Sequence, residues 1–509
     1  MSGLREAVTE RLELLEREEV PRRIWAGDHT VWSDEPTGIS DRLGWLTVHE
    51  EMRAQTDDLR EFARDCAKDG LRDVVLAGMG GSSLAAEVFR GVSGVTQGFL
   101  ELRILDTTHP DQIAALEREV DLPRALFVMA SKSGTTVETR CHLAHLWSRA
   151  PDGSRFVAIT DPGTPLAETA EERGFRRIFL NSPEIGGRYS GLSLFGLVPA
   201  AMIGVDLDGL LDGATDMAKR SAEDVPAGES PACTLGALMG EAALAGRDKL
   251  TLVLPEELGS LTAWIEQLIA ESTGKDGKGI VPVEGGVLGP PGVYGDDRVF
   301  VALGSAGGNA LLSWLARAGH PVERFDGDSA RLGEEMFRWE LATAVAGAIL
   351  GLNPFDQPDV ETSKLAAQRF LEAGRVPDPA PGDLHELLEA AEPPRYFAVQ
   401  AYVPRTEETV ARLRAVQLRV RDHRRTATTL GFGPRFLHST GQLHKGGPPT
   451  GLFVQIVEPP STDIPVPGED FTFGALLAAQ AAGDLETLRA LGRPAVRASL
   501  RELEDAAEV

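Results

Sequence analysis

Residues 127–140 read FVMASKSGTTVETR and show a strand, a polar turn and a helix in immediate succession. The apolar run Ala125–Met129 is typical of a buried parallel strand. The small and hydroxylated residues Ser131–Thr136 follow it, and a helical pattern begins at Val137. Such a turn directs backbone N–H groups, hydroxyls and the positive end of a helix dipole at one point, which suits an anion. The alternative is an ordinary turn whose Ser and Thr side chains only cap the helix.

A second glycine-rich turn follows another apolar run earlier in the chain. Val74–Ala77 is apolar, Gly78–Ser83 reads GMGGSS, and a helical pattern begins at Leu84. The turn lacks the third glycine of a dinucleotide fingerprint and the Gly-Lys-Ser/Thr of a Walker loop. Ligands of open α/β sheets bind at the carboxyl ends of the strands, where both turns would lie. The two turns together predict a phosphoryl group that is held without a metal.

Strands alternate with helices over most of the remaining chain, which predicts parallel sheets with right-handed crossovers. Further strands are expected at Leu102–Asp106, Phe156–Thr160, Arg177–Leu180, Leu250–Leu254, Ile280–Val283, Val299–Leu303, Tyr396–Tyr402 and Leu452–Val457. The predicted fold class is α/β, with two tandem doubly wound parallel-sheet domains and a C-terminal α/β segment. The expected limits are 1–70 for an N-terminal helical segment, 71–224 for the first domain, 225–372 for the second, and 373–509 for a linker with the C-terminal segment.

Composition and charge argue against several classes of partner. The chain has 509 residues, too many for one core, and a net charge of −26, which disfavours a surface for nucleic acid or an anionic membrane. No apolar run is long enough to span a bilayer and the N-terminus lacks a secretory signal pattern, so we expect a cytoplasmic protein. Cys66, Cys141 and Cys233 lie far apart and indicate neither a disulfide framework nor a clustered metal site.

Two charged residues are candidates for chemistry. Arg188, within Gly186–Ser190 (GGRYS), has a guanidinium fork that can bind a phosphate or a developing oxyanion. Glu271 ends a helix whose apolar residues share one face, and a partly desolvated carboxylate there could act as a base. Each has an ordinary alternative: a salt-bridged surface arginine, and a solvated glutamate at a helix end.

The remaining candidates lie beyond residue 350. Gln357 belongs to a proline-flanked turn, and Lys364 follows seven residues later, as a surface lysine or as a donor near a sugar ring oxygen. His438 and His444 lie in a glycine-rich loop before a strand. Loops of this kind often carry function, although two solvated histidines fit the same pattern.

Five segments in this order resemble the glucose-6-phosphate isomerase (phosphoglucose isomerase) family. They are GMGGSSL, SKSGTTVET, GGRYSG, QLIAESTGK and NPFDQPDVETSK, and they cover roughly residues 75–365. The stretches WAGDHTVWS and ISDRLGWL near the N-terminus and GFGPRFLHSTGQLHKGGP near the C-terminus resemble the isomerase half of bacterial transaldolase–isomerase fusions. The resemblance implies that both α/β domains are of the sugar-isomerase type.

The resemblance also implies roles for matched residues. A sugar phosphate would be held by Gly81, Ser82, Ser131, Lys132 (through its backbone), Ser133 and Thr136. Arg188 would steady negative charge on an enediolate, and Glu271 would carry the proton between C2 and C1. Gln357 and Lys364 would line the sugar, with Lys364 near the ring oxygen.

One histidine departs from the family pattern. The family's ring-opening histidine usually lies between the glutamate and the lysine, but here that interval contains only His320, in a Gly-His-Pro turn. We expect His438 to take the role instead, with His444 as the second candidate. This assignment requires a rearranged C-terminal region.

The resemblance implies an enzyme that interconverts glucose 6-phosphate and fructose 6-phosphate through a cis-enediol, in glycolysis and gluconeogenesis. It implies no metal and no organic cofactor. The alternatives are a dual isomerase of glucose and mannose phosphates, and a non-catalytic sugar-phosphate-binding regulator, a class that usually carries a DNA-binding helix-turn-helix not found in this sequence. The family commonly forms dimers, so a homodimer is a further expectation.

Overall fold

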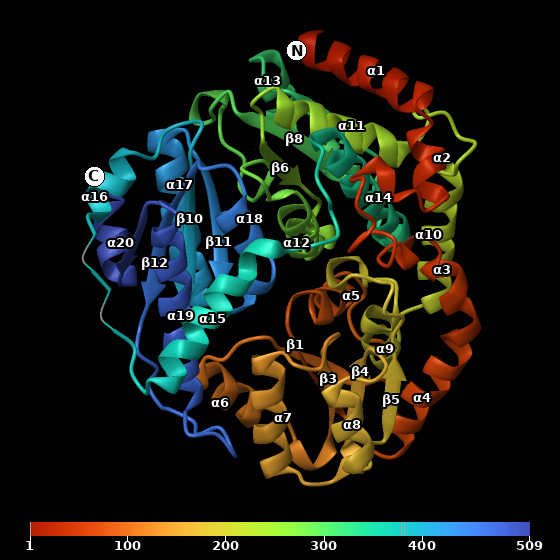
Figure 1. The fold of residues 1–509 in the computed structure, drawn as a ribbon, viewed down its shortest axis with the longest axis vertical. Coiled ribbons are helices and arrows are strands. Elements are labelled where there is room, and N and C mark those ends of the chain that lie inside the picture. Colours follow the sequence, from red (N-terminus) through yellow and green to blue (C-terminus); the bar gives the residue numbers. More distant parts are fainter. Residues whose placement is uncertain (1, 378, 381, 509) are drawn as a thin grey trace.

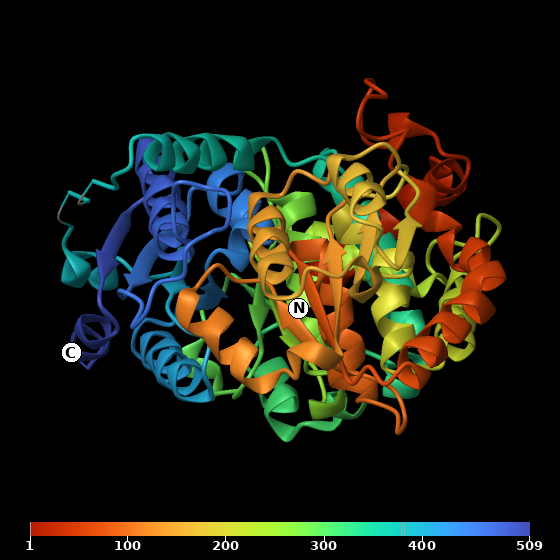
Figure 2. The same cartoon turned by 90° about the horizontal axis from the view of Figure 1, so that it is seen from below.

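The computed structural model describes residues 2–377, 379–380 and 382–508, and it shows a chain folded around three sheets (Figure 1). Neighbouring strands in all three sheets are parallel, so the predicted α/β class is confirmed. Figure 2, turned by 90°, shows the C-terminal part, in blue, at one end of the molecule.

The first sheet has the strand order β2-β1-β3-β4-β5. Its strands are β1 (Asp73–Gly78), β2 (Glu101–Leu105), β3 (Ala125–Ala130), β4 (Phe156–Thr160) and β5 (Arg177–Leu180). The connecting helices are α5 (Leu84–Ser93), α6 (Pro110–Glu119), α7 (Val137–Arg149) and α8 (Pro165–Glu172). The strand order reverses between β1 and β3, and open sheets bind ligands at such a point. Because Gly78 and Ala130 are register partners, the two predicted turns leave the sheet side by side.

The second sheet has the order β7-β6-β8-β9 and reverses between β6 and β8. Its strands are β6 (Lys249–Val253), β7 (Val281–Glu284), β8 (Arg298–Leu303) and β9 (Val322–Phe325). Helices α12 (Leu261–Thr273) and α13 (Ala310–Arg317) connect them, and α10 (Leu207–Arg220), α11 (Pro231–Leu244) and α14 (Leu332–Leu350) pack together alongside. Strand β9 falls outside the predicted strands, because VERF is short and carries two charges.

The C-terminal segment forms a third sheet with the order β11-β10-β12-β13. Its strands are β10 (Tyr396–Tyr402), β11 (Ala427–Phe432), β12 (Gly451–Val457) and β13 (Ala495–Ala498). Its helices are α16 (Leu384–Glu389), α17 (Glu407–Arg424), α18 (Gly441–Gly446), α19 (Phe473–Ala490) and α20 (Leu500–Ala506). The linking helix α15 (Glu361–Glu372) packs against α19. The strands of the three sheets lie within residues 73–180, 249–325 and 396–498, and the domain limits themselves remain a prediction.

The N-terminal residues form short helices on the outside of the first two sheets. They are α1 (Ser2–Arg17), α2 (Val20–Trp25), α3 (Val48–Glu51) and α4 (Thr56–Lys68), and α1 lies along α11 while α4 contacts α9 (Leu194–Met202). Across the described ranges, no helix combines the length and hydrophobicity needed to cross a membrane. The three cysteines are buried free thiols.

Shared cores hold the three sheets together. One hydrophobic core contains residues of β1, β3, β6 and β8 together with residues of α12 and α14. A smaller cluster joins Val281 and Val283 of the second sheet to Tyr396 and Ala427 of the third. The loops at the carboxyl ends of the strands are therefore held in fixed relation to one another.

Candidate active site

Residues 131–136, between β3 and α7, form a tight loop. The Ser131 hydroxyl accepts a hydrogen bond from the Gly134 N–H (3.1 Å) and bonds the Thr136 hydroxyl (3.0 Å). Gly134 has a φ of +68°, which favours glycine. Thr136 is the N-cap of α7, but its side chain accepts no hydrogen bond from the helix. The first N–H groups of α7 are thus not capped by that hydroxyl and can face an anion.

The GMGGSS turn touches two loops from other parts of the chain. A Cβ at Gly81 would lie 2.0 Å from the carbonyl oxygen of Gly187, and a Cβ at Gly80 would lie 2.5 Å from that of His438. No side chain fits at either distance. Glycine is therefore required where this turn meets the loops that carry Arg188 and His438.

The other predicted phosphate ligands lie in the same two turns. Ser82 is buried in the short turn Gly80–Ser82, whereas Ser133 is exposed and bonds the Thr135 hydroxyl (2.8 Å). The Lys132 side chain turns away to pair with Asp161, so its backbone is the part left to face a ligand.

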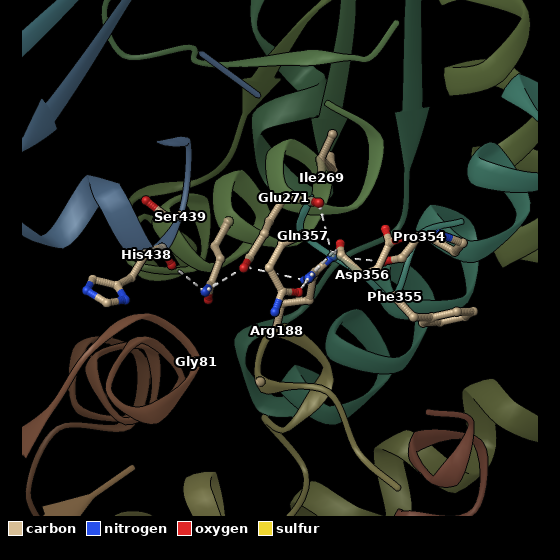
Figure 3. A network of polar contacts seen from close by, with 12 residues as sticks. Gly81, Arg188, Ile269, Glu271, Pro354, Phe355, Asp356, Gln357, His438 and Ser439 are labelled. Carbon is tan, nitrogen blue, oxygen red and sulfur yellow. Dashed lines mark hydrogen bonds and ion pairs between the residues drawn. The ribbon is translucent and has the colours of Figure 1, made fainter. Parts of the chain in front are cut away.

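Arg188 is buried in a group of backbone carbonyls. Its side chain is 3% exposed. Nη1 donates to the carbonyl oxygens of Glu271 (3.0 Å), Pro354 (2.9 Å) and Asp356 (3.1 Å), and Nη2 donates to Asp356 O (3.1 Å) and the Gln357 side-chain oxygen. Figure 3 shows the guanidinium among these residues. The site thus contains a fixed positive charge.

Glu271 faces the same guanidinium from the last turns of α12. Its Oε2 lies 3.3 Å from Arg188 Nε and accepts a hydrogen bond from Gln267 Nε2 (3.1 Å). Gln267 and Glu271 are four residues apart and share one helix face. The carboxylate is 14% exposed, so it is partly desolvated yet reachable. A base beside a fixed cation suits a reaction in which an oxyanion forms and is later protonated.

His438 lies in the loop that follows β11 of the third sheet, and its ring contacts α7 beside the first sheet. Its Nε2 lies 3.0 Å from Glu138 Oε1, and its carbonyl oxygen accepts from Gln267 Nε2 (2.7 Å). Glu138, in the first turn of α7, also accepts from Gln480 Nε2 (2.6 Å). Burial opposes ionisation of Glu138, but the charge and hydrogen bond of His438 outweigh it and lower the Glu138 pKa. Figure 3 shows the His438 ring pointing away from Arg188.

The other candidate histidines pack on aromatic rings, and each has a polar partner: His444 Nδ1 lies 3.2 Å from Gln400 Nε2, and His320 Nε2 lies 3.2 Å from the Pro291 carbonyl oxygen. His444 is 4% exposed against the Tyr396, Phe436 and Phe453 rings, and burial lowers its pKa to about 3. His320 packs on Tyr294 and Phe300, and burial lowers its pKa as well. Of the three, His438 alone contacts the residue that bonds Glu271, through its backbone carbonyl, and its role in ring opening remains a prediction.

Lys364 stands apart from this group. It lies on α15 with a side chain that is 57% exposed, and its Nζ is 3.6 Å from Glu361 Oε2. Within the described ranges, no hydrogen bond or ion pair joins Lys364 to Arg188, Glu271 or His438. Its place beside a sugar ring remains a prediction.

The site contains two further residues, Lys275 and Glu138, that the sequence analysis did not single out. Lys275 Nζ donates to Asp356 Oδ1 (2.6 Å), and burial followed by the charge of Arg188 lowers its pKa to about 8. It ties the end of α12 to the turn that holds Arg188. The other is Glu138, which lies inside the quoted stretch, where an acid in a first helical turn ordinarily complements the helix dipole. Both fall within segments that carry the family resemblance.

Two glycine- and hydroxyl-rich turns lie at a strand-order reversal, beside a carboxylate and a buried arginine, and this arrangement in an α/β protein suits a phosphorylated ligand held next to a base. The family model for phosphoglucose isomerase matches residues 30–288. A glucose-6-phosphate isomerase of Rubrobacter xylanophilus is 30% identical over 69% of this chain and 92% of its own length. One of Thermus thermophilus is 30% identical over 73% of this chain and 98% of its own.

Solved structures agree in fold. A Thermus thermophilus protein described as hypothetical has a TM-score of 0.61 and 28% identity, over 73% of this chain and 98% of its own length. A glucose-6-phosphate isomerase of Chlamydia trachomatis has a TM-score of 0.54 and 20% identity, over 70% of this chain and 79% of its own. The chain belongs to the phosphoglucose isomerase family.

Proposed function

We propose that this chain interconverts glucose 6-phosphate and fructose 6-phosphate, in glycolysis and gluconeogenesis. Its family and the names of its relatives support this activity. The observation that carries the proposal is the Glu271 carboxylate, 3.3 Å from the Nε of the buried Arg188 and next to the phosphate turns.

The proposed reaction begins with binding and ring opening. The phosphate lies between the turns that follow β1 and β3, with the uncapped N–H groups of α7 as donors. His438, oriented by Glu138, moves a proton so that the hemiacetal hydroxyl loses one and the ring oxygen gains one. Lys364 is the second proposed donor at the ring oxygen.

Proton transfer between C2 and C1 follows. Glu271 removes the C2 proton, the electron pair forms a C1–C2 double bond, and negative charge gathers on the C1 oxygen. Arg188 stabilises that charge because its position is already fixed by carbonyl groups. The proton of the C2 hydroxyl then passes to the C1 oxygen while Glu271 returns its proton to C1, which leaves the ketose with a C1 hydroxyl and a C2 carbonyl. Gln357, bonded to Arg188, lines the sugar.

The substrate range and the assembly are separate proposals. Turnover of fructose 6-phosphate to glucose 6-phosphate, compared with turnover to mannose 6-phosphate, separates a selective isomerase from a dual one. A shift in thermal unfolding with fructose 6-phosphate but without turnover would indicate a binding protein. Whether the chain forms a homodimer is tested by size-exclusion chromatography, with the molar mass of the eluting protein measured by light scattering. Arg188, Glu271, Glu138 and His438 belong to one chain, so we propose that each copy carries a whole site.

The test is a coupled assay on fructose 6-phosphate with Glu271→Gln. Gln keeps the size of the side chain but cannot take the proton, so kcat is expected to fall about 10²- to 10⁴-fold. Glu266→Gln is the matched control on the same helix, because burial raises the Glu266 pKa to about 8 and an uncharged amide resembles its neutral form. Full activity in Glu271→Gln would remove Glu271 from the mechanism.

A further inference from the structure

A cavity of about 300 Å³ lies where the second sheet meets the third, apart from the site described above. From the second sheet it is lined by Thr251 and Arg298 and by Tyr294, which precedes β8. From the third it is lined by Arg421 of α17 and Thr428 of β11. Its volume is at the lower end for small-molecule pockets, so it suits a metabolite rather than a peptide or a nucleic-acid strand.

Arg298 in this cavity is buried, and within the described ranges it forms no ion pair with a carboxylate. It is 1% exposed, and its Nη1 and Nη2 donate to Thr251 Oγ1 (3.0 Å) and to the Thr426 carbonyl (3.2 Å). Its Nε has no hydrogen-bond partner in the described part of the chain. Asp297, its neighbour in sequence, lies 3.7 Å from Lys249 instead. Burial lowers the pKa of Arg298 to about 10, as expected for a cation that is removed from water.

A second arginine converges on the same place. The Arg298 and Arg421 guanidinium carbons lie 5.6 Å and 5.5 Å from the centre of the Tyr294 ring. Arg421 Nε donates to Asp422 Oδ1 (2.7 Å). At the rim, Arg414 Nη2 donates to Glu284 Oε1 (2.6 Å).

The arginines around the cavity differ in their partners. Arg414 and Arg421 each bond one carboxylate, Glu284 and Asp422, whereas Asp297 acts on Arg298 only through space and the Nε of Arg298 has no hydrogen-bond partner in the described part of the chain. A buried cation with an unused donor is costly unless an anion completes it. Val283, Leu418 and the Tyr294 ring provide apolar walls next to it.

We propose that this cavity binds a small organic oxyanion, a carboxylate or a phosphate ester, whose charged group pairs with Arg298 and whose body packs on Tyr294. The guanidinium fork matches the geometry of either group. Such a ligand would touch both the sheet whose connecting helix carries Glu271 and the sheet next to the His438 loop. The proposal does not depend on the isomerase reaction.

The test is calorimetric titration of the whole protein with benzoate and with phenyl phosphate. We expect saturable binding of at least one of them, and Arg298→Met to weaken it about tenfold or more, since a charge-assisted bond is lost. Arg414→Met is the matched control at the rim, and it should change the affinity far less. Ser131→Ala removes a group of the phosphate turns and should leave this binding in place, which separates the two sites.

Two results would overturn the proposal. One is a wild-type protein that takes up neither probe at millimolar concentration, and the other is an Arg298→Met isotherm equal to the wild type. Should Arg298→Met fail to fold, crystals of the unaltered chain soaked in tungstate give the answer. Anomalous density beside Arg298 supports the site, and its absence there, with density at the phosphate turns, contradicts it.

Discussion

The Nε2 of His438 lies 3.0 Å from the Oε1 of Glu138, although the two residues are 300 positions apart in the chain. The pair joins the loop that follows β11 to the first turn of α7, next to residues 131–136. The His438 carbonyl also accepts a bond from Gln267, which donates to Glu271. The C-terminal sheet therefore supplies a candidate catalytic group.

Breaking this pair is expected to slow the opening of cyclic substrate. Glu138→Gln and His438→Gln should each lower kcat about 10- to 100-fold, and the double variant should lose little more, because both changes remove one unit. The measurement is the coupled assay on fructose 6-phosphate. His145→Gln breaks another imidazole–carboxylate pair, between His145 of α7 and Glu117 of α6 at 3.1 Å, and this variant should retain activity. Additive losses from the two single changes would contradict the coupling.

Gly81→Ala is expected to separate the phosphate turn from the Arg188 loop. The new Cβ would lie 2.0 Å from the Gly187 carbonyl oxygen, so one loop has to move. A displacement near 1 Å at a reacting centre costs roughly 100-fold in rate, and we expect a loss of that order in kcat/KM. Gly228→Ala, where an added Cβ meets nothing within 4 Å, is the control. Unchanged kcat/KM in Gly81→Ala would mean that the contact is not needed.

Acid is expected to weaken the attachment of the third sheet through Glu87. Arg405 Nη1 lies 3.1 Å from Glu87 Oε1, and Arg435 pairs with its other oxygen. Burial raises the Glu87 pKa, but the two arginines outweigh it and lower the pKa from 4.5 to about 2. The unfolded chain takes up this proton first, so the stabilisation is complete above about pH 5 and is lost as the pH falls towards 2.

Urea unfolding at several pH values measures this effect. The wild type should lose roughly 3 kcal/mol more of its unfolding free energy over that range than Glu87→Gln, which has no proton to take up. Parallel curves for the two proteins would contradict it.

Local patterns were enough to predict all strands of the first sheet, and β6, β7 and β8 of the second, but not β9. The turns after β1 and β3 combine apolar runs with glycine and hydroxyl residues, and these signals lie within a few positions of one another. Strands β11 and β13 were not predicted, because β11 begins just after the basic helix α17 and the four residues of β13, AVRA, include one large apolar side chain. The third sheet as a whole was therefore predicted only as an α/β segment.

The site shows where sequence reasoning ends. Arg188 is held by carbonyl oxygens of residues 271, 354 and 356, and a backbone oxygen has no residue type by which to recognise it. The meeting of His438 with Glu138 depends on how two sheets pack, which no local spacing contains. Lys364 was assigned by resemblance, and its exposed position on α15 neither tests nor supports that role.

The central claim is that Glu271 carries one proton between C2 and C1, and deuterium wash-in measures it most directly. Glucose 6-phosphate is incubated with the enzyme in D₂O and followed by proton NMR at C2. The account predicts that the C2 proton signal disappears as turnover proceeds, because a carboxylate exchanges its proton with solvent, and that Glu271→Gln slows this loss at least 100-fold while Glu266→Gln does not. Loss of the C2 proton signal at the wild-type rate in Glu271→Gln would contradict it.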